Sequence, residues 1–151
     1  KEYNKQYSKQ YRENNKEYYK EYNNIWRNNN KEKTNLYYKQ RRENNSLYKL
    51  SHTIRCLLSS SFKRKGYWKK SKTEQILGCT INEFIIHIQS QFTEGMTLEN
   101  HGKWEIDHKI PISSAKNEEE IIKLNHYTNL QPLWKEDNRS KLDKIPLITL
   151  R

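Results

Sequence analysis

A repeat of 15 residues dominates the first third of the chain. The pattern Arg-x-Asn-Asn begins at Arg12, Arg27 and Arg42, and between these marks aromatic residues recur at i, i+4 spacing. That spacing places the rings on one face of a helix, with Lys, Arg and Glu around them. Asn pairs are unfavourable inside helices and common at helix ends. The pattern therefore predicts consecutive helical segments that are interrupted near each Asn pair.

Positive charge is concentrated in the first half of the chain. Residues 1–75 contain 20 Lys and Arg against 7 Asp and Glu, whereas residues 76–151 contain 9 against 11. With a mean hydropathy of −1.26, the chain is too polar for all its residues to enclose one core. We interpret residues 1–50 as a basic helical arm that binds a polyanion. The alternative is a weakly structured tail whose Asn, Lys and Tyr content reflects an AT-rich genome.

The two cysteines and the apolar runs exclude several classes of protein. Cys56 and Cys79 are not spaced as a CxxC pair, so they cannot by themselves form a structural zinc site, and nothing indicates a disulfide framework. No apolar run is long enough to cross a membrane, and no secretory segment follows Lys1. We therefore expect an intracellular protein without a membrane partner. The missing initiator Met predicts that this sequence is a fragment of a longer protein.

Residues 51–73 are predicted to form the rest of an amphipathic helix and a basic linker. Apolar residues recur every three or four positions over residues 46–62, which is typical of a helix with one buried face. Six of the ten residues from 63 to 72 are Lys or Arg, and we expect them to contact phosphates. A solvated linker is the alternative. The predicted DNA contacts in this half are Arg41, Arg42, Arg55, Lys63, Arg64, Lys65, Lys69, Lys70 and Lys72.

A capping box opens the next predicted helix. Thr80 and Glu83 have the Ser/Thr-x-x-Glu spacing in which each side chain accepts a hydrogen bond from the other residue's backbone N–H. Beyond it, residues 104–111 and 126–134 read as extended segments, and a predicted helix over 117–124 lies between them. A further helix is predicted to start near Glu136. The order is strand, long connection, strand, helix.

Three motifs on this frame resemble the HNH nucleases of the ββα-metal fold. They are Asp107-His108 in WEIDHKIP, Asn129 before Leu-Gln-Pro-Leu-Trp, and Asp137-Asn138 followed by Lys141. The similarity is greatest to HNH endonucleases of phage and large-virus type, and it covers about residues 74–141. It implies a mostly helical α+β protein in which residues 74–151 form the HNH domain behind a helical lead-in and the basic arm. It also implies the cytoplasm of a bacterial or virus-infected host cell.

The resemblance assigns a role to each motif residue. His108 would be the general base, Asn129 would orient its ring and tie the loop to the first strand, and Asp107 and Asn138 would hold one divalent ion. Because Asn138 supplies a neutral oxygen, this HNN variant favours Mg²⁺, with Mn²⁺ as the second candidate, over zinc or nickel. The residues expected to contact phosphates beside the site are Lys135, Arg139 and Lys141.

The function implied is metal-dependent hydrolysis of DNA phosphodiester bonds, with duplex DNA as the expected partner. Each site would cut one strand, so a double-strand break would require a homodimer or two successive nicks. The sequence leaves intron homing, restriction, packaging and toxin roles open. Two alternatives remain at this point: a nucleic-acid-binding protein without catalysis, and an HNH nuclease that acts on structured DNA or on RNA.

Overall fold

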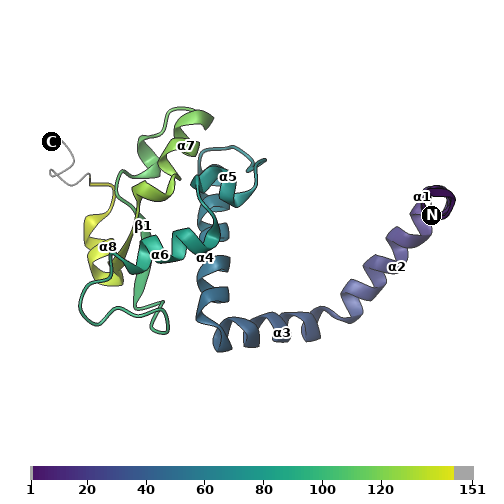
Figure 1. Cartoon of the computed structure of the whole chain (residues 1–151), viewed down its shortest axis with the longest axis horizontal. Helices are drawn as coiled ribbons and strands as arrows, with labels where there is room; N and C mark the ends of the chain where they lie inside the picture. The colour runs from purple at the N-terminus through teal and green to yellow at the C-terminus, as the bar shows by residue number, and fades with distance from the viewer. Residues whose placement is uncertain (1, 145–151) are drawn as a thin grey trace. The chain divides into compact units, whose positions relative to one another are not determined.

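The computed structural model describes residues 2–144 and contains mostly helix, with one antiparallel sheet of two strands (Figure 1). This confirms the expected α+β class. The chain divides into two compact units, Lys1–Arg41 and Arg42–Arg151. The division precedes the boundary predicted at residue 50, and residues 51–73 do not stand apart, because Leu50 lies within the helix Ser46–Arg64, whose apolar face is buried in the second unit.

Three helices of similar length form the N-terminal part. They are α1 (Glu2–Asn14), α2 (Lys16–Asn29) and α3 (Lys31–Asn44). The interruptions fall at Asn15, Asn30 and Asn45, so the predicted 15-residue spacing of helical segments is confirmed. At the first two, the Asn side chain donates a hydrogen bond of 2.8 Å to the backbone oxygen four residues before it. Neither α2 nor α3 contains a buried residue, because nothing in this unit covers their aromatic faces.

The second unit is built from five helices, two strands and two short 3-10 turns within the described residues. These are α4 (Ser46–Arg64), α5 (Thr73–Leu77), α6 (Ile81–Gln89), β1 (Trp104–His108), η1 (Ile112–Ser114), α7 (Glu118–Leu124), η2 (Tyr127–Asn129), β2 (Leu130–Trp134) and α8 (Lys135–Lys141). Helix α4 packs against α6 and α7, and α8 packs against both strands (Figure 1). No helix among residues 2–144 is long and apolar enough to cross a membrane.

Helix α4 supplies one wall of the core. Asn45 caps it by accepting a hydrogen bond of 2.7 Å from the backbone N–H of Tyr48. The predicted apolar stripe is buried at Leu50, Ile54, Leu58 and Phe62 and partly buried at Leu57, but Leu47 in the first turn is exposed. The capping box of α6 is also confirmed, since the Thr80 hydroxyl accepts from the backbone N–H of Glu83, and the Glu83 carboxylate accepts from that of Thr80.

The sheet separates two faces that carry different side chains. Strand β1 pairs with β2 so that Trp104 lies opposite Trp134 and His108 lies opposite Leu130. Trp104, Ile106 and His108 face the core, whereas Glu105 and Asp107 alternate to the face that α8 covers. The strand–strand–helix order is therefore present. Pro132 is tolerated in β2 because each strand of a two-stranded sheet has a free edge.

Candidate functional site

A cavity of about 370 Å³ lies at the end of β1 and brings together residues far apart in the sequence. Asp107 and His108 line it from the strand, and Arg64 and Lys65 line it from the end of α4. The loop after β1 and residues beyond α8, including Asp143, complete its wall. This cavity is lined by two of the four residues that the sequence assigned to catalysis and to the metal, His108 and Asp107.

The His108 ring is held by a residue that the sequence did not indicate. His108 is buried, with 7% of its surface exposed, and its Nε2 lies 2.9 Å from the amide oxygen of Asn125. The Asn125 amide nitrogen donates 2.8 Å to the backbone oxygen of Ile121, so its oxygen must face the ring. Nε2 therefore carries the hydrogen, and Nδ1 is the acceptor.

The surroundings of His108 keep its imidazole neutral. Burial is the largest influence and lowers the pKa of His108, and the charges of Lys141 and Arg64 act in the same direction. The hydrogen bond to Asn125 and the charge of Asp107 oppose the shift without reversing it. A neutral imidazole with a free Nδ1 can accept a proton at pH 7.

Asp107 forms the one ion pair between described residues of the second unit. Its Oδ2 lies 2.9 Å from the Lys141 ammonium and accepts a hydrogen bond of 3.1 Å from Gln131. The same ammonium donates 2.7 Å to the backbone oxygen of His108. Both charged side chains are mostly buried, at 12% and 14% exposure. In the structure Lys141 therefore binds the strand, not solvent, although the sequence favoured a phosphate contact.

Asn138 lies on the same face of the sheet as Asp107 but has a different partner. Its amide nitrogen donates 2.9 Å to a carboxylate oxygen of Glu105. The structure therefore shows no direct contact between the two residues that the sequence assigned to one ion. Glu105, Asp107 and Asn138 still place three oxygen-bearing side chains between β1 and α8, which is donor chemistry that suits Mg²⁺.

Asn129 fastens the segment between the strands. Its side-chain oxygen accepts 2.9 Å from the backbone N–H of Ile110, and its nitrogen donates to the backbone oxygens of Ile110 and Leu124. The bonds with Ile110 join Asn129 to the loop that follows β1, where the sequence predicted a tie to the first strand. The predicted contact with the His108 ring is wrong, because Asn125 occupies that position. No local pattern marks Asn125, which follows the last residue of α7 like an ordinary helix-terminal Asn.

Some of the predicted DNA-contacting side chains are exposed, whereas others are partly buried or already bound to backbone oxygens of the protein. The Lys65 ammonium donates 2.6 and 2.8 Å to the backbone oxygens of Ser113 and Ala115, so it fastens the loop after β1. Lys69 donates to the backbone oxygen of Ser71. Arg42, Lys69 and Lys135 are partly buried, whereas the exposed members of the set are Arg41, Arg55, Lys63, Arg64, Lys70, Lys72 and Arg139.

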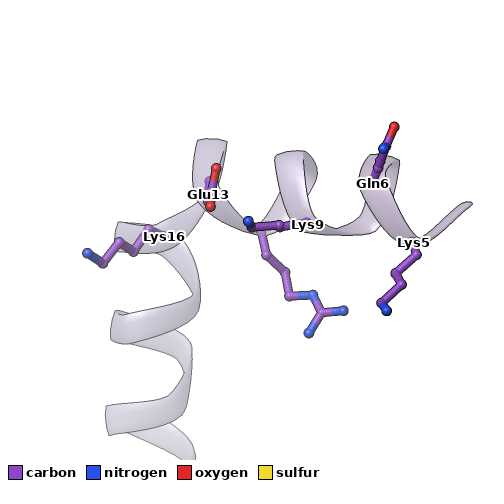
Figure 2. A pocket seen from close by; sticks show the side chains of 6 residues that line it. Lys5, Gln6, Lys9, Glu13 and Lys16 are labelled. Atoms are coloured by element: carbon purple, nitrogen blue, oxygen red, sulfur yellow. The ribbon is translucent and has the colours of Figure 1, made fainter. Parts of the chain in front are cut away.

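Two further cavities gather basic side chains. One of about 500 Å³ lies where α8 begins and is lined by Lys103, Trp134, Lys135, Glu136 and Arg139. The other, of about 590 Å³, lies where α1 meets α2. Figure 2 shows that it is lined by Lys5, Gln6, Lys9, Glu13 and Lys16, and Arg12 joins them. Each cavity carries more cations than carboxylates, which is the charge pattern of a site for polyanions.

His101 is a second buried imidazole in the second unit. It is 8% exposed, packs edge-on against Trp104, and its Nδ1 has no hydrogen-bond partner among the described residues. Burial, together with the charge of Lys49, lowers the pKa of His101 to about 4. Within residues 2–144, no three His, Cys, Asp or Glu side chains come close enough to hold a metal ion.

Two proteins of Acanthamoeba polyphaga mimivirus are similar to this chain. Uncharacterized protein L426 is 36% identical over 119 residues, which are 77% of this chain and 52% of that protein. Uncharacterized protein L246 is 30% identical over 100 residues, which are 64% of this chain and 43% of that protein. The chain therefore spans about half the length of the curated relatives it matches. No family model matches the chain, and no solved structure matches it.

Proposed function

We propose that the second unit is an HNH endonuclease of the ββα-metal fold that hydrolyses DNA phosphodiester bonds with one divalent ion. One observation carries the proposal: His108, held neutral with a free Nδ1, lines the same cavity as Asp107 at the end of a strand–strand–helix unit. The two mimivirus relatives support a viral origin and carry no information on activity.

The His108 ring would act as the general base. Nδ1 accepts a proton from water as the water oxygen forms a bond to phosphorus, and the bond from phosphorus to the 3′ oxygen breaks. The leaving 3′ oxygen takes a proton from solvent and the His108 imidazolium releases its proton to solvent, so the products are a 5′ phosphate and a 3′ hydroxyl. During the transfer Asn125 keeps accepting from Nε2, so the ring does not rotate, and the adjacent Asp107 carboxylate favours the imidazolium that forms.

Asp107 and Asn138 would hold Mg²⁺ or Mn²⁺. The fit rests on the oxygen donors between β1 and α8 and on the ion pair with Lys141, in which the Asp107 carboxylate already binds a positive charge. To share one ion, Lys141 must leave Asp107, whereas Asn138 binds Glu105 through its amide nitrogen, a bond that does not use its side-chain oxygen. When bound, the ion would offset negative charge on the phosphate and the leaving oxygen.

The basic arm is proposed to hold the duplex by its phosphates. In α2 and α3 all the apolar residues are at least partly exposed, and the junction of α1 and α2 gathers Lys5, Lys9, Arg12 and Lys16 around one cavity. Exposed aromatic rings such as the stacked pair Tyr18 and Tyr22 add surfaces on which unpaired bases could stack. The backbone phosphates supply most of the non-specific affinity of such a contact.

A nucleic-acid-binding protein without catalysis is the second candidate. It is favoured by the ion pair of Asp107 with Lys141, because the ammonium already neutralises the carboxylate that would hold the ion. Such a protein would bind DNA in a salt-sensitive way and would not cleave it. A nuclease for structured DNA or RNA would instead cleave those substrates faster than a linear duplex.

Incubation of supercoiled plasmid with the full chain tests the proposal. We expect relaxed or linear plasmid with Mg²⁺ or Mn²⁺ and intact plasmid with EDTA, because the ion is required to offset charge on the phosphate. The same reaction with a branched DNA and a structured RNA identifies the preferred substrate. A plasmid that stays supercoiled with every ion, although the protein binds it, would favour the second candidate.

Deletion of residues 1–41 tests the role of the arm. We expect weaker binding to a duplex and a flatter dependence of log Kd on log salt, by about 0.9 for each phosphate that the arm no longer neutralises. Fluorescence anisotropy over a series of salt concentrations measures both quantities. A full-length variant with Gln in place of Lys5, Lys9, Arg12 and Lys16 is the control, because it removes charge and keeps the helices. Equal binding by the truncated and full-length proteins at every salt concentration would contradict this role.

A further inference from the structure

Arg64 is the last residue of α4 and lines the cavity that contains Asp107 and His108. Its side chain is exposed and forms no ion pair or hydrogen bond with any residue from 2 to 144. It comes from outside the three motifs that carry the family resemblance. The Arg64 guanidinium is therefore a cation at the candidate active site that stabilises no other described residue through an ion pair or a hydrogen bond.

The position of Arg64 is fixed by its neighbours in the chain. Phe62 is buried in the core, and Lys65 binds the backbone oxygens of Ser113 and Ala115 across the cavity. The backbone on both sides of Arg64 is therefore anchored, while the guanidinium is free to meet a ligand. The charge of Arg64 also lowers the pKa of His108, so the two groups lie within electrostatic reach of one another.

Among the charged side chains that line the cavity, one cation has no partner among the described residues and is available to bind an anion. Lys65 is bound to backbone oxygens, and Lys141, which pairs with Asp107 while no ion is bound, does not line the cavity, whereas Asp143 adds a second carboxylate to the wall. A phosphate that entered beside two carboxylates would be repelled without an opposing cation. Of the basic residues that the structure describes around this cavity, Arg64 alone is uncommitted.

We propose that Arg64 binds the non-bridging oxygens of the scissile phosphate beside His108, an inference that rests on the proposed nuclease function. A guanidinium offers two parallel N–H donors that match two phosphate oxygens. The contact strengthens as negative charge grows on phosphorus during the attack, so it acts on the rate more than on ground-state affinity.

Single-turnover cleavage of a duplex by saturating protein tests Arg64. We expect Arg64→Ala to lower the rate by about 100- to 1,000-fold, the usual effect of removing a donor to the transition state, with Kd changed by less than about threefold. Arg64→Lys should recover part of the rate, because it restores the charge without the fork. Lys123→Ala is the matched control, since Lys123 is an exposed cation of the second unit that lies outside the cavity and is not among the predicted DNA contacts; its rate at saturation should stay unchanged.

The proposal is overturned if Arg64→Ala lowers the rate at saturation no more than Lys123→Ala does. A second readout separates it from the nuclease proposal. We expect an uncleaved duplex in Ca²⁺ to shift the NMR resonance of the Arg64 Nε–H group more than that of Arg55. If the wild type does not cleave any substrate, the nuclease proposal fails, and an unmoved Arg64 resonance then overturns the phosphate contact as well. A shifted resonance in a protein that does not cleave would retain the contact as a binding site.

Discussion

Replacement of His108 by Ala should lower the rate of plasmid cleavage by about 1,000-fold, within the range that a general base contributes. The neutral ring presents Nδ1 as the acceptor, and no other imidazole lines the cavity within the described residues. The initial rate of loss of supercoiled plasmid with Mg²⁺ measures the effect. The rate of the wild type should also fall as the ring is protonated below neutral pH, with a midpoint below the ordinary pKa of histidine.

Two variants control for damage to the fold. His108→Gln retains a side-chain donor toward Asn125, so it should preserve packing better than Ala and remain equally inactive. His126→Ala removes a nearby imidazole that lies outside the cavity and contacts Thr128, and its rate should stay within about twofold of the wild type. Full activity of His108→Gln, or an equal loss in His126→Ala, would remove His108 from the reaction.

Acidification from pH 7 to pH 4 should reduce the free energy of unfolding by about 3 kcal/mol through His101 alone, since its pKa falls from 6.5 to about 4 in the folded protein. Between these two values the unfolded chain binds a proton that the folded chain does not, so stability is complete above pH 6.5 and is lost as the pH falls. His108, whose pKa is also lowered, adds to the loss in the same direction.

Urea unfolding at a series of pH values, followed by Trp fluorescence, measures this dependence, because Trp104 is fully buried beside His101. His101→Phe is the matched variant, since it keeps an aromatic ring against Trp104 and removes the titrating nitrogen. Its stability should fall less between pH 6.5 and pH 4 than that of the wild type. If the two curves ran parallel over this interval, His101 would not be a neutral buried imidazole.

Features specified by neighbouring residues could be predicted before the structure. The breaks at Asn15, Asn30 and Asn45 and the cap at Thr80 depend on backbone groups within four residues, so the sequence pattern contained all the required partners. The alternation that sends His108 and Asp107 to opposite faces follows in the same way from the period of a strand.

The binding partners of the basic residues were harder to predict, because the charge of a side chain does not show which group it binds. Lys65 and Lys141 were indistinguishable from other phosphate-binding candidates in the sequence. Each instead satisfies backbone oxygens, and Lys141 also pairs with a carboxylate, on elements distant in the chain. Arg64, in the same basic run as Lys65, has no such partner and faces the cavity. Only the packing of α4 against the loop after β1 separates the two roles.

The sequence by itself determined the helices and their breaks and the order of the strands, because these depend on short-range spacing, whereas the candidate pair Asp107 and His108 came from the resemblance of its motif. The tertiary structure decided which nitrogen of His108 is free, through Asn125, and which cation faces it, through the end of α4. Those contacts join residues 17 or more positions apart, and a one-dimensional pattern does not encode which distant groups meet once the apolar faces are buried.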